Sequence, residues 1–267
     1  MCWIMKITVV KVGGAIVEDK QRLQRLIEDF SAIDGHKILV HGGGRLATKV
    51  AAQLGIESHM VGGRRITDAD MLDVVTMVYG GLVNKQIVAG LQAKGVNAVG
   101  LTGADMNLIC SHIRPVKKVV ADGVEQEVDF GYVGDVDRVD ATKLEMLLRN
   151  GIVPVIAPLT HNGEGHILNT NADTMASETA KALAADNDVT LVFSFEKRGV
   201  LSDPDNDDSV LPVITHELFR KYVGEGIISG GMIPKVENAL EAVEKGVRKV
   251  VITLATAIDG NSGTIIQ

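Results

Sequence analysis

Residues 7–14 read ITVVKVGG, a run of β-branched residues that one lysine interrupts and two glycines end. Such a run predicts a buried strand that stops at Gly13. The next segment places Leu23, Leu26, Ile27 and Phe30 at the i, i+3, i+4 and i+7 positions, which predicts a helix with one apolar face. The chain therefore begins with a strand, a glycine turn and a helix.

The same order recurs along the chain. Residues 37–41 predict a second strand, which ends at Gly42-Gly43-Gly44 before another amphipathic helix. Further strands are predicted at residues 96–101, 152–157, 189–195 and 249–254, and further helices at 68–93, 141–150, 173–185, 215–223 and around 233–243. We expect the helix at 68–93 to be bent, and Pro154 to make the strand at 152–157 irregular. Alternating strands and helices predict an α/β fold with a mainly parallel central sheet and helices on both faces.

One segment departs from this alternation. Two β-rich arms within residues 107–133 flank Asp122-Gly123, which is a strong signal for a β-hairpin turn. We expect the hairpin to project over one end of the sheet. A division of the chain, if there is one, is expected near residue 185, although nothing in the sequence interrupts a continuous domain.

Composition excludes several classes of protein. The net charge is −7 and the lysines are scattered, so no basic face for nucleic acid is expected. Cys2 and Cys110 lie far apart without metal-ligand spacing, and no apolar run approaches the ~20 residues that span a bilayer. We expect a cytoplasmic protein that binds neither nucleic acid nor a membrane.

The two early glycine loops are candidates for phosphate binding. Gly13-Gly14 and Gly42 to Gly44 both follow predicted strands, and the carboxyl ends of parallel strands share one edge of the sheet. Backbone N–H groups of glycines can approach phosphate oxygens closely. The alternative is that these loops are only tight turns. Neither GxxxxGK[ST] nor a helix-opening GxGxxG occurs, which disfavours a P-loop protein or a Rossmann dehydrogenase.

Three cations lie beside glycines. Lys11 precedes Gly13-Gly14, Arg65 follows Gly62-Gly63, and Lys235 follows Gly230-Gly231. Phosphoryl transfer needs such groups, because its catalysis consists mostly of positioning and of neutralising charge on the migrating group. We expect Lys11 and Lys235 to meet across a cleft. Each cation taken alone is more typical of a solvated surface.

Five runs resemble the ordered motifs of the acetylglutamate kinases, within the amino acid kinase family. They are VVKVGG (9–14), VHGGG (40–44), GRRIT (63–67), NTNAD (169–173) and GIISGGMIPKV (226–236). Together they cover almost the whole chain. The resemblance implies an amino acid kinase-like fold and transfer of a phosphoryl group from ATP to the γ-carboxylate of N-acetyl-L-glutamate, a step of arginine biosynthesis.

The resemblance also implies roles for the catalytic and phosphate-binding residues. Lys11 would hold the migrating phosphoryl group, Lys235 would stabilise the leaving phosphate side, and Asp173 would orient both lysines. Mg²⁺ would be carried by the nucleotide phosphates, with no metal site in the protein itself. The glycines implied in nucleotide binding are Gly13, Gly14, Gly230 and Gly231.

The substrate side is implied in the same way. Gly43 and Gly44 would contact the acyl-amino-acid substrate through their backbone, Arg65 would bind a substrate carboxylate, and Asn169 would bind its amide or carboxylate. Alternatives remain for three of these residues. Asn169 and Asp173 could be the N-cap and first-turn acid of the next helix, and Arg65 could pair with Asp68 or Asp70 on the surface.

Two features depart from the pattern of the family. Where the family carries an aspartate-containing turn, this chain reads SFEKRG at residues 194–199, which leaves the adenine and ribose contacts open. Only ten residues precede Lys11, whereas arginine-inhibited members carry a helical extension there. We therefore expect insensitivity to arginine and a plain homodimer.

The resemblance leaves the acyl group open. N-succinylglutamate or another N-acylated acidic amino acid is the alternative substrate, and a non-catalytic sensor of the same fold is the alternative to an enzyme. Residues 1–185 would form a lobe that binds the acyl-amino acid, and residues 186–267 a lobe that binds the nucleotide.

Overall fold

The computed structural model describes residues 4–62, 64–121 and 124–267. Its centre is an eight-stranded sheet in which neighbouring strands run parallel except for one antiparallel pair, β15 and β16. From one edge to the other its strands are β14 (Val213–Ile214), β16 (Thr264–Ile266), β15 (Lys249–Leu254), β13 (Asp188–Phe195), β1 (Lys6–Val12), β2 (His36–His41), β10 (Val153–Ile156) and β5 (Ala98–Leu101). The predicted mainly parallel sheet is confirmed.

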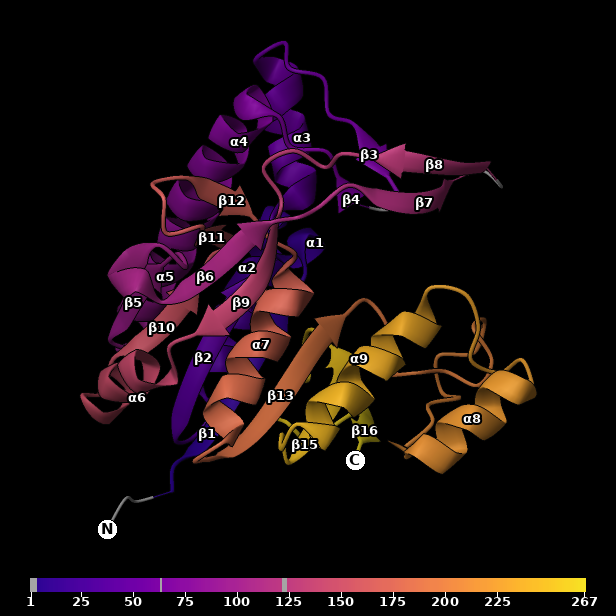
Figure 1. Ribbon diagram of the computed structural model, residues 1–267. Helices are drawn as coiled ribbons and strands as arrows, with labels where there is room; N and C mark the ends of the chain where they lie inside the picture. Colours follow the sequence, from indigo (N-terminus) through magenta and orange to yellow (C-terminus); the bar gives the residue numbers. More distant parts are fainter. Residues whose placement is uncertain (1–3, 63, 122–123) are drawn as a thin grey trace.

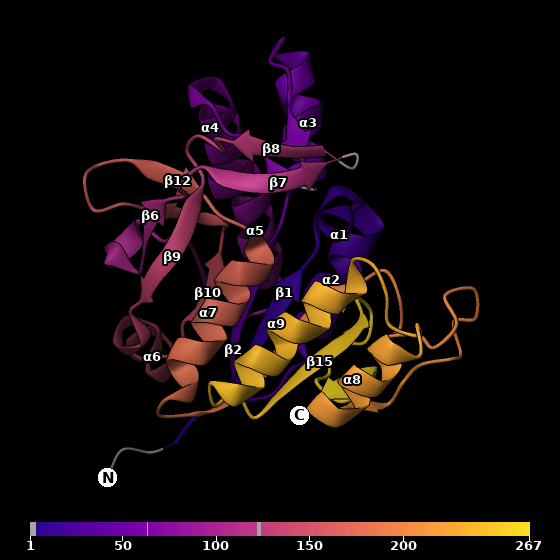
Figure 2. The ribbon, with the colours of Figure 1, turned by 45° about the vertical axis from the view of Figure 1, so that its right-hand side comes forward.

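Helices cover both faces of this sheet (Figures 1 and 2). One face carries α6 (Ala141–Arg149), α7 (Ala172–Ala184) and α9 (Met232–Glu244), with α8 (His216–Gly224) beside α9. The other carries α1 (Gly14–Glu18), α2 (Lys20–Ser31), α3 (Gly44–Gln53), α4 (Ala69–Val75) and α5 (Asn84–Ala93). Because side chains alternate along a strand, Val9 packs under α7 while Val10 packs on the opposite face. Both faces of the central strands are therefore apolar, as the valine-rich sequences of these strands predict.

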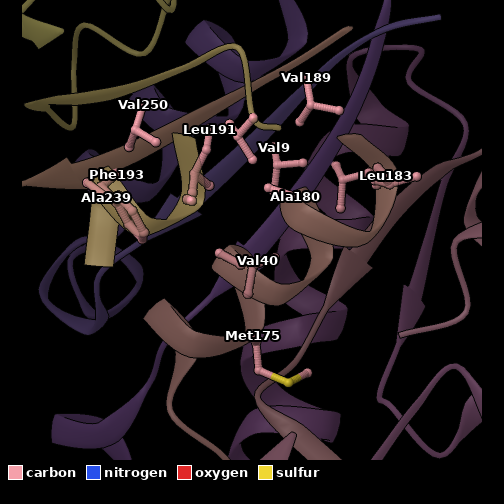
Figure 3. Packing of buried hydrophobic residues seen from close by; sticks show 14 of the residues in the cluster. Val9, Val40, Met175, Ala180, Leu183, Val189, Leu191, Phe193, Ala239 and Val250 are labelled. Atoms are coloured by element: carbon pink, nitrogen blue, oxygen red, sulfur yellow. The ribbon is translucent and has the colours of Figure 1, made fainter. Parts of the chain in front are cut away.

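The side chains between the sheet and α7 form a continuous apolar layer (Figure 3). Val9 and Leu191 from neighbouring strands contact the cluster that contains Met175 and Ala180 of α7, and all four side chains are 0% exposed. Ala239 brings α9 into the same layer. This packing fixes both helices relative to β1 and β13.

The register of the central strands sets the position of the loops. Lys11 of β1 lies opposite Phe193 of β13 and Val40 of β2, and β13 ends two residues later. The loops that follow β1, β2 and β13 therefore leave the sheet at the same edge. Seven pairs of residues join β1 to β13, so the sheet runs without a break across the expected division near residue 185.

The helix predicted at residues 68–93 contains an irregular middle. Between α4 and α5, Thr76–Val83 is π-helical and includes Gly80-Gly81. The whole helix, Ala69–Ala93, is long and apolar enough by composition to cross a membrane, with a mean hydropathy of 1.3 over an 18-residue window. In the fold it packs on the sheet, with Val78, Ile87 and Leu91 buried in the core, which is the usual role of such a helix in a globular protein.

Smaller sheets lie above the carboxyl edge. A four-stranded sheet contains β12 (Ile167–Asn169), β11 (Leu159–His161), β6 (Ile109–Ile113) and β9 (Gly134–Val139), and a two-stranded one joins β3 (Met60–Val61) to β4 (Arg64–Arg65). The predicted hairpin is present as β7 (Lys117–Ala121) and β8 (Val124–Val128), which project from the body (Figure 1). Its predicted turn, Asp122-Gly123, lies outside the described residues.

Pro154 lies inside the sheet, in β10. It is paired with Val99 of β5, whereas the ladder with β2 begins only at Val155. A proline has no N–H group to donate, so the shortened ladder on the β2 side confirms the expected irregularity.

Candidate active site

The two glycine loops touch each other at the carboxyl edge of the sheet. A Cβ atom on Gly14 would lie 3.4 Å from the backbone nitrogens of both Gly43 and Gly44, and one on Gly42 would lie 3.1 Å from the nitrogen of Gly14. The Gly42 N–H donates to the Val12 carbonyl at 2.9 Å, which ties the second loop to the end of β1. Side chains would hold these backbones apart.

The ring of Tyr79 explains why residue 43 is a glycine. A Cβ atom on Gly43 would lie 2.9 Å from the Cδ1 atom of the Tyr79 ring, which is closer than real Cβ contacts. Burial raises the pKa of the Tyr79 phenol, and the neighbouring Arg65 guanidinium partly opposes that rise. Tyr79 comes from the π-helical segment, and nothing in the sequence indicated that it would reach the loop.

His41 supports the second loop from below. Its Nδ1 atom lies 2.9 Å from the Gly42 carbonyl oxygen and its Nε2 atom 3.2 Å from the Asn84 amide nitrogen. Burial lowers the pKa of His41 to about 4, so the ring is neutral, with Nδ1–H donating and Nε2 accepting. His41 is therefore a buried, hydrogen-bonded residue at the end of β2.

Lys11 and Asp173 form an ion pair beside the first loop. The Lys11 Nζ atom lies 2.7 Å from the Asp173 Oδ1 atom, with 9% of the lysine side chain and 37% of the aspartate side chain exposed. Lys11 comes from the end of β1 and Asp173 from the first turn of α7. The packing of α7 on β1 therefore brings them together.

Two asparagines near the start of α7 have different roles. Asn171, not Asn169, is the N-cap, and its side chain accepts hydrogen bonds from the backbone N–H groups of Asp173 and Thr174. The alternative in which Asn169 caps this helix is wrong. Asn169 lies on β12 and donates to the Thr67 hydroxyl at 2.9 Å. Asp173 is a first-turn acid, as that alternative supposed, but it also binds Lys11.

Lys235 reaches the same place from α9. Its Nζ atom lies 4.2 Å from the centroid of the Phe195 ring, and the Lys11 Nζ atom lies 5.2 Å from the same centroid. The two ammonium nitrogens can be no farther apart than the sum of these distances. Asp173, the third catalytic candidate, pairs with Lys11. The Phe195 ring lies near the ammonium groups of both lysines.

A large cavity, of about 500 Å³, opens beside these lysines. Gly13, Gly14 and Gly44 line one side of it, and Phe195 and Lys235 line another. Gly230 and Gly231 lie just before α9, where Gly230 has a left-handed φ of 54°. These two glycines are not among the lining residues, but Met232 and Lys235 of the helix that they introduce are. We call this space the donor cavity.

A second cavity, of about 210 Å³, lies on the other side of the glycine loops. Gly42, Gly43 and Gly44 line it together with Arg65 and Asn169. Gly44 lines both cavities, so they meet at this residue. We call this second space the acceptor cavity.

Arg65 is a buried cation in the acceptor cavity, with only 9% of its surface exposed. Its guanidinium donates to the Gly44 carbonyl at 2.8 Å, to the Thr48 hydroxyl at 2.9 Å and to the Ser58 hydroxyl. The alternative in which Arg65 pairs with Asp68 or Asp70 on the surface is therefore wrong. Within the described part of the chain no carboxylate pairs with Arg65, and a buried charge of this kind favours an anionic ligand.

Two more arginines line the acceptor cavity, Arg64 and Arg114. Arg114 donates from both Nε and Nη2 to one oxygen of Asp135, at 3.0 and 2.6 Å. Burial lowers the pKa of Arg64 and repulsion from Arg114 lowers it further, while Asp135 opposes both effects. The sequence interpretation missed Arg114 because it lies far from the motifs, although Arg64 is part of the GRRIT run. Gly63 of that run lies outside the described residues.

This arrangement suits transfer of a group between two anions. The donor cavity offers backbone nitrogens and the Lys235 ammonium group, and the Lys11 ammonium group lies near the Phe195 ring that lines it. Such groups bind phosphate oxygens. The acceptor cavity offers guanidinium groups, which bind carboxylates with two parallel hydrogen bonds. Transfer would occur where the cavities meet, at the glycine loops.

Comparisons with known proteins agree with this geometry. A model of the amino acid kinase family matches residues 6–254. The chain is 65% identical over 262 residues to the acetylglutamate kinase of Phocaeicola vulgatus (98% of each chain) and 64% identical to that of Bacteroides fragilis (98% of this chain, 97% of the relative). A crystal structure of smu.665 from Streptococcus mutans UA159 superposes with a TM-score of 0.74 at 28% identity, covering 98% of both chains.

The family match covers nearly all of the described sheet, from β1 to β15. Both catalytic candidates on β1 and α9, and both cavities, lie within the matched residues. The chain therefore belongs to the amino acid kinase family.

Proposed function

We propose that this protein transfers a phosphoryl group from ATP to the γ-carboxylate of N-acetyl-L-glutamate, giving an acyl phosphate in arginine biosynthesis. The observation that carries the proposal is that Gly44 lines both the donor and the acceptor cavity, while Lys235 lines the donor cavity and Lys11 lies near the Phe195 ring in its wall. The relatives at 64–65% identity over 98% of this chain, which are named acetylglutamate kinase, support the choice of reaction.

The mechanism that we propose is direct in-line transfer without a covalent enzyme intermediate. The γ-carboxylate is already ionised at neutral pH and attacks the γ-phosphorus, while ADP leaves with the bridging oxygen. No proton has to be removed, so the neutral His41 has a structural role. Lys11 and Lys235 balance the negative charge that spreads over the migrating group. Asp173 holds the Lys11 ammonium group in place through the ion pair of 2.7 Å.

Backbone groups complete the proposed donor site. The N–H groups of Gly13 and Gly14, and of Gly43 across the contact between the loops, would bind phosphate oxygens. Removing one preorganised donor of this kind costs about 3 kcal/mol of barrier in comparable oxyanion sites. Gly230 and Gly231 would act less directly, because they set the start of α9 from which Lys235 extends.

Mg²⁺ would enter this site on the nucleotide. The donor cavity is lined by one carboxylate, Glu196, which already faces Arg45 at 3.7 Å. Phosphate oxygens and water, ligands that Mg²⁺ prefers, would therefore supply most of its coordination. When bound it would neutralise phosphate charge, while the residues of the chain position the reacting groups.

Binding of the acceptor rests on Arg65 and Asn169. The buried Arg65 guanidinium would bind the α-carboxylate, and the Asn169 amide would bind the acylamide group from the opposite wall. The Gly44 backbone, which accepts a hydrogen bond from Arg65, lines the same cavity. This arrangement would direct the γ-carboxylate toward the donor cavity.

A hydroxylamine trap tests the proposed reaction. Acyl phosphates react with hydroxylamine to give hydroxamates, which are measured by their colour with Fe³⁺. We expect hydroxamate with ATP and N-acetyl-L-glutamate, and none with free glutamate, whose ammonium group would face the arginines. No hydroxamate with any N-acylglutamate would overturn the proposal and leave a sensor of the same fold.

One observation favours a second acceptor, N-succinylglutamate. Arg64 lines the acceptor cavity, and no ion pair of Arg64 is found within residues 4–62, 64–121 and 124–267, whereas Arg114 is balanced by Asp135. A succinyl group ends in a third carboxylate that could pair with Arg64. In the trap, a higher kcat/KM with the succinyl than with the acetyl substrate would select this acceptor, and Arg64→Gln would reverse the preference.

We also propose that the enzyme works in the cytoplasm as a homodimer. Met77 and Leu82 are 54% and 44% exposed on the long helix, and a second subunit would cover them. Every residue lining the acceptor cavity precedes residue 185, which supports an acyl-amino-acid lobe at 1–185. The donor cavity takes residues from both parts of the chain, so the nucleotide would not be bound by residues 186–267 alone.

A further inference from the structure

The Phe195 ring contacts the ammonium groups of both lysines. Lys235 Nζ lies 4.2 Å and Lys11 Nζ 5.2 Å from the ring centroid, both within the ~6 Å over which a cation is attracted to an aromatic face. Phe195 is the last residue of β13 and begins the turn in which this chain departs from the pattern of its family. The aromatic side chain therefore stands at the junction of the proposed catalytic groups.

The ring is held in a defined position. Phe195 stacks on the buried Phe193, with centroids 6.2 Å apart and the planes inclined by 28°. Phe193 is the register partner of Lys11, so all three side chains project from the same face of the sheet. That face is covered by α7 and α9, which carry Asp173 and Lys235. The fold thus places one aromatic ring between the elements that supply the charges.

Carboxylates lie near Lys235 but pair with other lysines. Asp173, Glu178 and Glu241 line a cavity together with Phe195 and Lys235, and both glutamates pair with Lys181, at 3.0 and 2.7 Å. Asp173 pairs with Lys11, and no salt bridge to Lys235 is found in the portion of the chain that the structure describes. A second carboxylate would hold Lys235 but would also accept its N–H groups and repel phosphate oxygens. An aromatic face attracts an ammonium group through its quadrupole and leaves the remaining N–H groups free to donate.

We propose that Phe195 is a positioning residue for phosphoryl transfer, holding the Lys11 and Lys235 ammonium groups beside the donor cavity by cation–π attraction. The inference rests on the proposed function of the two lysines. Phe195 does not bind the migrating group itself. It orients the lysines, so its loss lowers kcat and leaves the affinity for both substrates nearly unchanged.

Fluorination of the Phe195 ring tests whether the electrostatic attraction of the ring, and not its shape, supports catalysis. Replacing Phe195 in the full-length protein by 4-fluoro-, 3,5-difluoro- and 3,4,5-trifluorophenylalanine weakens the negative ring face stepwise and alters its volume little. We expect kcat in the hydroxylamine assay to fall stepwise, by about tenfold in total. KM for ATP and for the acylglutamate should change by less than about twofold. Phe195→Tyr, which keeps the ring face, should retain most of the activity that Phe195→Leu loses.

Phe30 offers a matched control. Its buried ring also lies near an ammonium group, that of Lys37, at 5.4 Å, but Lys37 lies near the start of β2, at the opposite edge of the sheet. The same fluorine series at Phe30 should leave kcat unchanged. Equal declines at both positions, or an unchanged kcat across the Phe195 series, would overturn the inference. So would a rise in KM for ATP at constant kcat, which would make Phe195 a nucleotide contact.

The wild-type protein in the same assay distinguishes failure of the positioning role from failure of the proposed function. Hydroxamate formation by the wild type, with a flat Phe195 series, would refute the positioning role and leave the proposed function intact. No hydroxamate from the wild type with any N-acylglutamate would refute the proposed function, and the positioning role would fall with it.

Discussion

Replacing Asp173 by asparagine tests the ion pair at the centre of the proposed site. The substitution keeps the size of the side chain and an oxygen acceptor, but it removes the negative charge that lies 2.7 Å from the Lys11 ammonium group. Lys11 is only 7% exposed and has little water to replace that charge. Its other contact is the Phe195 ring at 5.2 Å. We expect the lysine to lose its fixed position, while both cavities keep their shape.

The size of the effect follows from the burial of the two partners. Exposed ion pairs contribute about 0.2–1 kcal/mol, whereas breaking a buried ion pair costs about 3–5 kcal/mol. Asp173 exposes 37% of its side chain, so solvent screens part of the interaction. A loss of about 1.5 kcal/mol of transition-state stabilisation predicts a kcat lowered by about tenfold. Loss of a first-turn acid should also destabilise α7 by about 0.3–1 kcal/mol.

Steady-state kinetics with the hydroxylamine trap check this prediction. Glu178→Gln is the matched control, because Glu178 lies on the same helix and pairs with a different lysine, Lys181, at 3.0 Å. We expect kcat to fall for Asp173→Asn but not for the control, with KM for ATP and substrate nearly unchanged in both. If Asp173→Asn lowers the melting temperature yet keeps full kcat, the ion pair serves stability alone and the reasoning is refuted.

Three further predictions concern other residues. Lys235→Ala should lower kcat by about a hundredfold while KM rises less than threefold, because its contact strengthens in the transition state; equal activity would remove it from the mechanism. Arg65→Lys should raise KM for the acylglutamate by about ten- to a hundredfold and leave KM for ATP unchanged, since a lysine cannot form two parallel hydrogen bonds; an unchanged acceptor KM would contradict this role. The folded-state pKa of His41 is about 4, below its ordinary 6.5, so the unfolded chain takes up a proton first as the pH falls. Stability should therefore drop by about 3 kcal/mol between about pH 6.5 and about pH 4, as urea unfolding would measure, and His41→Gln should not show that share of the drop.

The main sheet could be predicted because its signals are local. β1 and β2 are short apolar runs ended by glycine, and the helices that follow them show a 3.6-residue apolar period. Parallel pairing then places Gly13 and Gly42 at the same edge without further information. The contact between the loops, with Gly14 packed against Gly43, is a consequence of neighbouring strands, β1 and β2.

The four-stranded sheet could not be predicted in this way. β6 pairs with β9 and, at one residue, with β11, and each strand is only three to six residues long. Such pairings depend on segments far apart in the chain, and short strands carry little periodic signal. Arg114 reaches the acceptor cavity only because it follows β6 directly. The position of Arg114 in the acceptor cavity could therefore not be predicted before the pairing of β6 was known.

The turn after β13 shows what a sequence motif can predict and what it cannot. Comparison with the family pattern identified residues 194–199 as a departure, and at that stage the departure only left the nucleotide contacts open. The fold gives Phe195 a different significance, because α9 brings Lys235 over the ring and β1 brings Lys11 beside it. An aromatic residue can take a carboxylate's place next to two cations because its face attracts positive charge without neutralising it. Since the lysines must keep their charge for the phosphoryl group, a ring at this position is compatible with catalysis where an ordinary apolar residue would not be.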